Sequence, residues 1–348
     1  MNLLRQQIAQ MLCFGFSGHQ LEHNEALQAI LASPDGIGAL ILFDYDCHTN
    51  TQGKNILSLA QTKKLNQAIK TFYAAHHPEN RPIWLAIDLE GGRVDRLKHC
   101  AQYAGLASAA DIASFSYKQR QQLWQENADL IKQLGFDINF APVIDLNLSP
   151  NEGIFGPLGR CFSDIPEEVA LYALEFLSIY HQAGIIGCLK HYPGHGSAKA
   201  DSHHGFVDVT DTFTRDELIP YHMILKSSHL VPMIMTAHVI NRQLDPSGLP
   251  ATLSETMLKQ QLRGELNYQG IIISDDLQMH AIANCFGLEE AIIKTIGAGA
   301  DMLIFGNQLG QHQVKDIIDL IETLVIHQKI DRHCIETAYQ RIMALKNI

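Results

Sequence analysis

The chain has 348 residues, of which 46% are hydrophobic and 18% charged, as in ordinary soluble globular proteins. Its 26 basic and 37 acidic residues leave a net charge of −11 without any dense basic run, so neither nucleic acid nor a membrane surface is an expected partner. The sequence shows no signal peptide, no run near the roughly 18 apolar residues of a membrane span, and no CxxC pair among its seven cysteines. We therefore expect a cytoplasmic protein.

Short β-rich runs alternate with longer helical runs along the whole chain, which is typical of a parallel sheet with crossover helices. The pattern predicts eight strands, at residues 11–16, 39–43, 83–88, 138–145, 185–190, 233–238, 271–275 and 302–305. It also predicts helices at 23–32, 56–75, 117–134, 166–183, 214–227, 254–266, 288–297, 313–327 and 331–346. Ser254 and Asp331 are suitable N-caps, and Thr214 with Glu217 three residues later predicts a capping box.

Eight such units closing on themselves form an α/β fold of the (β/α)8 TIM-barrel type, here with an extra C-terminal helix. No linker or shift in composition divides the chain, so residues 1–348 are expected to form a single catalytic domain. An open, doubly wound sheet is the competing architecture. It would call for a crevice ligand such as a nucleotide, and the sequence contains neither GxGxxG nor a Walker loop.

Ionisable residues stand at the ends of five predicted strands that are otherwise apolar. In a barrel the carboxyl ends of the strands face one shared site, and charged residues are seldom left at the edge of a core unless they are paired. Any one of them could instead cap a turn. Together they favour an active site built from Asp88, Asp145, Lys190 with His191, His238, and Asp275 with Asp276.

Two glycine-containing clusters add charged groups near the expected site. Asp88-Leu-Glu-Gly-Gly-Arg-Val-Asp-Arg96 places carboxylates and guanidiniums directly after a predicted strand, and Gly159-Arg160-Cys161-Phe162 places an Arg on a later loop. Carboxylates accept paired hydrogen bonds from hydroxyl groups, and guanidinium offers a rigid fork of donors. This combination suits a polyhydroxylated ligand.

The segment from Lys190 to Phe206 reads KHYPGHGSAKADSHHGF and is rich in histidine. It has little apolar material to bury, so a solvated surface loop is the simplest interpretation. A metal site is a second one, since His191, His195, His203, His204 and Asp275 are all possible ligands. Their spacing is not the i, i+4 spacing of a helical zinc motif, and the Pro-Gly and Gly residues predict a flexible loop. We therefore predict no metal and no cofactor.

These motifs resemble family 3 of the glycoside hydrolases, and specifically its single-domain β-N-acetylglucosaminidase branch. The resemblance extends from about residue 10 to 345, in the family's order. The matching motifs are Asp88-x-Glu-Gly-Gly-Arg-Val-x-Arg96, Gly159-Arg-x-Phe162, Lys190-His-Tyr-Pro-Gly-His-Gly196, Asp201-Ser-His203 and Ser274-Asp-Asp-Leu-x-Met279. Two stretches depart from the family pattern, namely Ser197-Ala198, which replaces an Asp-Thr pair, and His204-Gly205, which stands where an apolar residue is common.

The resemblance implies retaining hydrolysis of terminal, non-reducing β-linked N-acetylglucosamine. It assigns Asp275 as the nucleophile, His203 as the acid/base and Asp201 as the partner of His203. The residues expected to hold the sugar hydroxyls are Asp88, Arg96, Arg160, Lys190 and His191, with the N-acetyl group near the histidine-rich loop. A histidine with an ordinary pKa near 6.5 can both give and take a proton, and Asp201, two positions earlier in an extended segment, would project from the same side.

The implied substrate is a small saccharide or muropeptide of cell-wall recycling, an N-acetylglucosaminyl-anhydromuramyl saccharide or peptide. Three alternatives stay open: a glycoside phosphorylase using the same site, a metal-dependent hydrolase using the loop histidines, and a non-catalytic sugar-binding barrel. The sequence does not indicate an oligomeric state.

Overall fold

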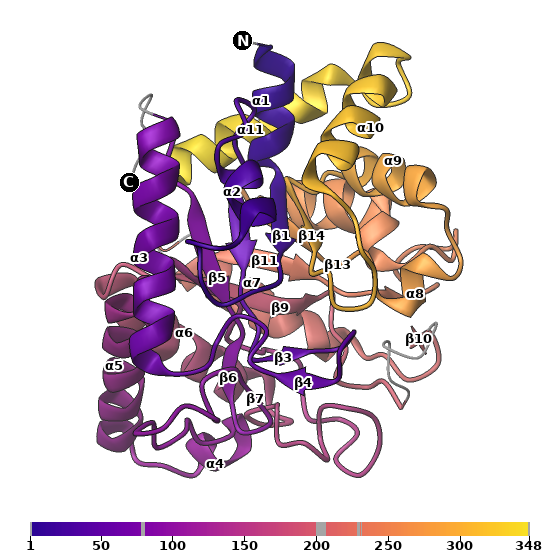
Figure 1. Ribbon diagram of the computed structural model, residues 1–348. Coiled ribbons are helices and arrows are strands. Elements are labelled where there is room, and N and C mark those ends of the chain that lie inside the picture. The colour runs from indigo at the N-terminus through magenta and orange to yellow at the C-terminus, as the bar shows by residue number, and fades with distance from the viewer. Residues whose placement is uncertain (1, 78–80, 200–206, 228–229, 231, 347–348) are drawn as a thin grey trace.

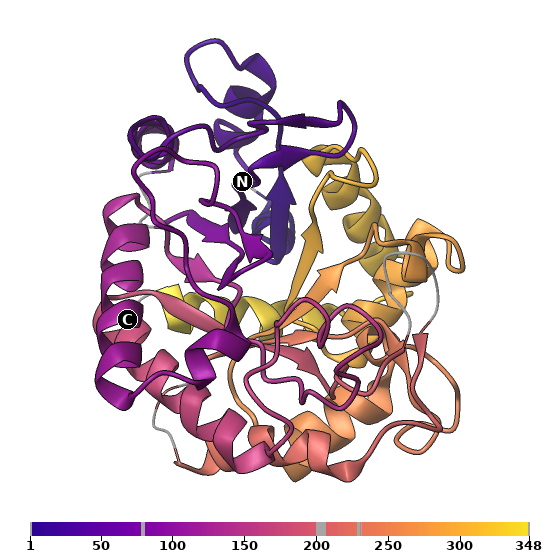
Figure 2. The ribbon, with the colours of Figure 1, turned by 90° about the horizontal axis from the view of Figure 1, so that it is seen from below.

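The computed structural model describes residues 2–77, 81–199, 207–227, 230 and 232–346. In this part of the chain, eight parallel strands close into a barrel in the order β1-β14-β13-β11-β9-β8-β5-β2, with helices around it (Figures 1 and 2). The barrel strands are β1 (Leu12–Gly15), β2 (Ala39–Ile41), β5 (Trp84–Ile87), β8 (Ile138–Asn139), β9 (Ile186–Tyr192), β11 (Met233–Thr236), β13 (Ile272–Asp276) and β14 (Met302–Phe305).

The first and last barrel strands pair with each other, and this closes the sheet. Leu12 lies opposite Leu303 and Phe14 opposite Phe305, in parallel register. All eight predicted strands are confirmed, and the barrel is confirmed over the open sheet. The strands read as apolar runs because their residues are buried on both faces, between the barrel interior and the surrounding helices.

The helices follow the prediction closely, but the structure also has short helices that were not predicted. The long ones are α2 (Glu25–Leu31), α3 (Leu59–His76), α5 (Tyr117–Gln133), α6 (Pro166–Gln182), α7 (Ile219–Ser227), the π-helix η3 (Thr256–Glu265), α9 (Leu288–Ala298), α10 (Val314–Ile326) and α11 (Arg332–Lys346). The helices α1 (Leu3–Gln10), α4 (Ala109–Ala113) and α8 (His280–Ala283) and the 3-10 turn η2 (Ala251–Leu253) were not predicted. The predicted helix 214–227 is a 3-10 turn, η1 (Arg215–Leu218), that leads into α7.

The predicted helix starts have different outcomes. The backbone N–H of Met257 donates to Ser254 Oγ at 3.0 Å, and that of His333 donates to Asp331 Oδ1 at 2.9 Å, so both caps are confirmed. The capping box at Thr214 is wrong, because the Thr214 side chain makes no cap hydrogen bond. Glu217 turns instead toward a distant loop, where it accepts a hydrogen bond from the backbone N–H of Gly196.

Two hairpins project beyond the carboxyl ends of the barrel strands. One is β3 (Tyr45–Asp46) with β4 (Thr51–Gln52), and the other is β6 (Leu89–Gly91) with β7 (Val94–Asp95). In Figure 1 these hairpins lie at the opposite end of the barrel from α1 and α11. Within the part of the chain that the structure describes, no helix is long and apolar enough to cross a membrane.

Candidate active site

A cavity of about 260 Å³ opens at the carboxyl ends of the barrel strands. Most of the charged residues predicted for the site line it, although they are far apart in the sequence. They are Asp88, Arg96, Arg160, Lys190, His191, Asp275 and Asp276. Arg93, the other guanidinium of the first motif, is exposed and is not among the lining residues.

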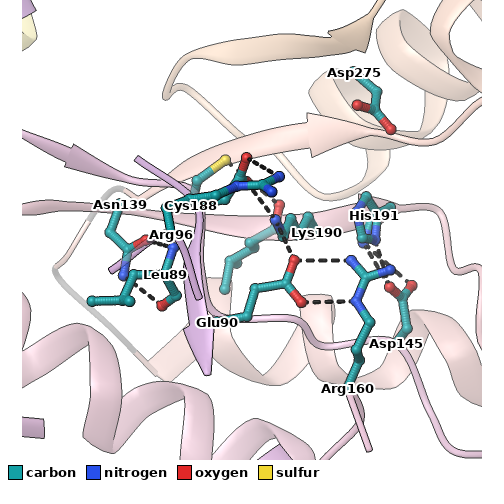
Figure 3. A network of polar contacts seen from close by, with 12 residues as sticks. Leu89, Glu90, Arg96, Asn139, Asp145, Arg160, Cys188, Lys190, His191 and Asp275 are labelled. Atoms are coloured by element: carbon teal, nitrogen blue, oxygen red, sulfur yellow. Dashed lines mark hydrogen bonds and ion pairs between the residues drawn. The ribbon is translucent and has the colours of Figure 1, made fainter. Parts of the chain in front are cut away.

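The floor of the charged side is an ion-pair network centred on Glu90 (Figure 3). The Arg160 guanidinium donates from Nε and Nη2 to the two Glu90 oxygens, both at 2.8 Å. Lys190 Nζ lies 2.6 Å from Glu90 Oε1 and donates to Asp88 Oδ1 at 3.1 Å. Arg96 Nη2 is 3.6 Å from Asp88 Oδ2. Asp88 therefore faces two cations, and its carboxylate is held in a fixed position beside the cavity.

The charges of this network stabilise one another. Burial acts to raise the pKa of Glu90, but Arg160 and Lys190 outweigh it and hold that pKa well below its usual range. Burial likewise acts to lower the pKa of Lys190, and the carboxylates of Glu90 and Asp88 outweigh it and raise that pKa. Glu90 and Lys190 therefore stay ionised near neutral pH, and charged groups form the stronger hydrogen bonds to sugar hydroxyls.

The tight turn after Leu89 requires glycine. Gly91 and Gly92 have φ values of 103° and 57°, in the left-handed region. A Cβ on Gly91 would lie 2.1 Å from the carbonyl oxygen of Ala107. The two glycines thus let the chain reverse between β6 and β7, so that Arg96 returns to the cavity that Glu90 already lines.

His191 is oriented from behind by Asp145. Its Nδ1 lies 2.7 Å from Asp145 Oδ2, and its backbone N–H also donates to that carboxylate (Figure 3). Burial acts to raise the pKa of Asp145, but His191 outweighs it and lowers that pKa. A charged Asp145 keeps the proton on Nδ1 and leaves Nε2 for a ligand. Asp145 is therefore a supporting residue, although its place at a strand end predicted a member of the site.

Asp275 stands apart from the network, at the end of β13 (Figure 3). Its Oδ1 accepts a hydrogen bond from the backbone N–H of Asp276 at 2.8 Å. His238, also predicted from a strand end, is buried and braces the same strand, with Nε2 2.9 Å from the carbonyl oxygen of Asp276. Asp201 and His203, the predicted acid/base pair, lie outside the described residues.

The stem of the histidine-rich loop is buried, which corrects the expectation of a solvated loop. Lys190, His191 and Tyr192 belong to β9, and His195, Ser197 and Ala198 are at most 3% exposed. The His195 backbone N–H donates to Asp145 Oδ1 at 2.8 Å, and burial lowers the pKa of its imidazole to about 4. His195 is therefore neutral at ordinary pH.

A second carboxyl group holds this stem and was not predicted as part of the site. Glu217 is 1% exposed, and its Oε2 accepts the Gly196 N–H at 2.9 Å. Burial raises the pKa of Glu217 to about 7. Among the described residues, no three His, Cys, Asp or Glu side chains come together in a way that could hold a metal ion.

The fold and the cavity together define a (β/α)8 barrel whose ligand site lies at the carboxyl ends of its strands and suits a polyhydroxylated molecule. The chain belongs to glycosyl hydrolase family 3, since the model of the family 3 N-terminal domain matches residues 3–345. The family resemblance seen in the motifs is thereby confirmed.

Named relatives agree with this assignment. The chain is 31% identical to "Beta-hexosaminidase A" of Pseudoalteromonas piscicida over 342 residues, which cover 91% of this chain and 54% of that protein. It is 33% identical to "Beta-hexosaminidase" of Idiomarina loihiensis over 291 residues, 82% of each chain. A solved family 3 β-N-acetylglucosaminidase from Paenibacillus sp. str. FPU-7 superimposes with a TM-score of 0.87 at 28% identity, over 99% of this chain and 62% of that one. The chain thus spans little more than half of the Pseudoalteromonas protein.

Proposed function

We propose that this chain is a retaining β-N-acetylglucosaminidase that removes terminal, non-reducing β-linked N-acetylglucosamine. The observation that carries the proposal is the position of Asp275, on a strand end, in the same cavity as Asp88, Lys190 and His191. A nucleophile needs a rigid support, and a strand of the barrel supplies one. The named activities of the relatives support the choice of sugar.

In the proposed reaction, Asp275 attacks the anomeric carbon and forms a covalent bond to it while the glycosidic bond breaks. His203 gives its proton to the departing oxygen and then takes one from water, which attacks the same carbon and releases Asp275. Asp201 stabilises the cationic form of His203 between the two steps. Two displacements at one carbon restore its configuration, so the product keeps the β-anomeric form.

For the natural substrate we propose N-acetylglucosaminyl-anhydromuramyl saccharides or peptides, as the motif resemblance implies, and for the setting peptidoglycan recycling in the cytoplasm. A phosphorylase using the same site is the second candidate. A neutral histidine as the acid/base repels phosphate less than a carboxylate would.

The test begins with wild-type turnover of a chromogenic N-acetylglucosaminide in phosphate-free buffer and in phosphate. NMR of the first-formed product should show β-N-acetylglucosamine in both buffers. N-acetylglucosamine 1-phosphate would indicate a phosphorylase, and a first-formed α-anomer of the free sugar would contradict retention. Asp275→Ala should lower turnover by at least about 1,000-fold. If the variant retains more than a tenth of the activity, Asp275 is not the nucleophile.

The His203 assignment has its own signature. His203→Ala should reduce turnover of a disaccharide far more than turnover of an aryl glycoside with an activated leaving group, because only the poor leaving group needs a proton. The ratio of kcat/KM for the two substrates, in variant and wild type, measures this difference. Equal losses of kcat/KM on both substrates would contradict the acid/base assignment of His203.

A further inference from the structure

Arg96 lies between two carboxylates that follow neighbouring strands. Its Nη2 is 3.6 Å from Asp88 Oδ2, and its Nη1 is 3.5 Å from Asp44 Oδ1. Asp88 follows β5 and Asp44 follows β2, and these two strands pair in the barrel. Asp88 lines the cavity, whereas Asp44 is buried and is not among the described residues that line it. Asp44 is therefore placed to act on a ligand through Arg96 rather than by touching it.

The guanidinium of Arg96 leaves much of its donor capacity unused. Both of its ion-pair distances exceed the roughly 2.7–2.9 Å of a close charge-assisted hydrogen bond. Its Nε is buried and has no hydrogen-bond partner among the described residues. Its central carbon is 5.4 Å from the centre of the Phe43 ring, which lines the cavity with it. Buried donors are normally paired, so an underused guanidinium beside a cavity indicates a ligand that completes its hydrogen bonds.

Asp44 has a fixed position because it directly precedes the β3–β4 hairpin. Its carbonyl oxygen accepts the Gly53 N–H at 2.5 Å, which closes the base of the hairpin. The preceding backbone is fixed as well, since the Phe43 N–H donates to Asn55 Oδ1 at 2.9 Å and the Phe43 carbonyl oxygen accepts the Asn55 N–H at 2.9 Å. A hydrogen-bonded backbone therefore presents the carboxylate of Asp44 to Arg96.

We propose that Asp44 is a positioning residue for sugar binding, which keeps Arg96 from closing on Asp88 so that both can bind a sugar hydroxyl. This inference rests on the proposed function, because it takes Arg96 and Asp88 as sugar ligands. With Asp44 in place, two carboxylates at nearly equal distances attract the guanidinium, and it closes on neither. Without the charge of Asp44, Arg96 would form a bidentate pair with Asp88, and the two groups would satisfy each other instead of the sugar.

Asp44→Asn tests this role, with Asp46→Asn as the matched control. Asp46 belongs to the same hairpin, where its Oδ1 accepts the His48 N–H at 2.9 Å. The measurements are kcat and KM for an aryl N-acetylglucosaminide and for its 3-deoxy, 4-deoxy and 6-deoxy forms. Asp44→Asn should raise the KM of the parent substrate about tenfold and leave kcat within about threefold, because the lost contacts bind substrate and transition state alike. Asp46→Asn should match the wild type in both.

The deoxy substrates distinguish positioning from a general loosening of the fold. In the wild type, kcat/KM should fall most for the form that lacks the hydroxyl bound by Arg96 and Asp88. In Asp44→Asn this penalty should shrink about tenfold, since the two side chains then bind each other rather than the hydroxyl. A loss by the same factor on the parent and on every deoxy form would overturn the role of Asp44 while the proposed function stands.

A double-mutant cycle tests whether Asp44 acts through Arg96. In an Arg96→Ala background, Asp44→Asn should change kcat/KM, and the dissociation constant of free N-acetylglucosamine measured by calorimetry, by less than about twofold. Additive losses would overturn the proposal. If the wild type binds N-acetylglucosamine but hydrolyses no N-acetylglucosaminide, the proposed function fails and the cycle on the dissociation constant still decides the role of Asp44. If it neither binds nor hydrolyses the sugar, both proposals fail.

Discussion

At the scale of single residues, Glu90 does most to hold the charged side of the cavity in place. Its side chain is 4% exposed, and among the described residues it is the one carboxylate that forms ion pairs with both Arg160 and Lys190. Without the negative charge of Glu90, the cations of Arg160 and Lys190 would repel each other. The sugar-binding role that the motifs assign to Arg160 and Lys190 therefore depends on a residue between them that was not assigned one.

Glu90→Gln tests this dependence. The variant keeps the shape of the side chain but leaves Arg160 and Lys190 without the shared negative charge. We expect the free energy of unfolding to fall by about 3 kcal/mol or more, because one partner of a buried ion pair is lost. Urea unfolding at pH 7 measures this change.

Glu90→Gln should also raise the KM for an N-acetylglucosaminide, because Lys190 is then drawn more strongly to Asp88. Glu255→Gln is the control, since Glu255 forms an exposed i, i+4 pair with Lys259 and should cost less than about 0.5 kcal/mol. Equal losses of stability in the two variants would show that the charge of Glu90 does not stabilise the network.

At the scale of elements, the stem of the histidine-rich loop is clamped from two sides. A Cβ on Gly196 would lie 1.8 Å from the carbonyl oxygen of Leu146, and the Gly196 N–H points to Glu217 on η1. Gly194 has a φ of 141°, and a Cβ there would meet the Glu217 side chain at 2.7 Å. Only glycine fits either position, so η1 and the loop after β8 together fix where the stem leaves the barrel.

This clamp predicts a pH dependence of stability. The pKa of Glu217 is about 7 in the folded protein, against an ordinary value of 4.5. Between these pH values the folded state keeps the proton and the unfolded state has lost it, so stability falls as pH rises. Relative to Glu217→Gln, which does not titrate, the wild type should lose up to about 3 kcal/mol between pH 4 and pH 8. Urea unfolding of both proteins across this range measures the difference.

Asp216→Asn is the matched control for this prediction, because Asp216 is the exposed neighbour of Glu217 on η1. That variant keeps Glu217 and should keep the pH dependence of the wild type. A constant difference between wild type and Glu217→Gln at all pH values would show that Glu217 titrates normally in the folded protein.

The sequence predicted elements and strand-end residues well, but contacts between distant loops poorly. Asp88, Lys190 and Asp275 were predictable because each ends an apolar run, and barrel topology brings such ends together. The role of Glu217 was not predictable. Its spacing from Thr214 indicates a local capping box, and nothing in the sequence indicates its contact with the distant Gly196. The β3–β4 hairpin was also missed, since strands of two residues are too short to show a periodic pattern.

At the scale of the whole molecule, the two ends of the barrel have separate tasks. The carboxyl end carries the cavity, and the opposite end is closed by the first and last helices of the chain. Lys346 Nζ of α11 donates to Gln10 of α1 and to the carbonyl oxygens of Gly38 and Pro82, which precede β2 and β5. Substitutions at this end should therefore change stability without changing the site.

Asp301 gives the sharpest test of that separation. It is 1% exposed at the start of β14, where it pairs with Arg263 of η3 and Arg341 of α11 and accepts the N–H of Ile272 at 2.8 Å. Asp301→Asn retains an acceptor for Ile272 but leaves both guanidiniums without their shared charge, so the free energy of unfolding should fall by about 3–5 kcal/mol. Below the unfolding transition, kcat and KM should stay at wild-type values. Asp301 and its two arginines lie beside the start of β13, whereas Asp275 lies near its end. A stable variant with impaired turnover would show that the two ends are coupled.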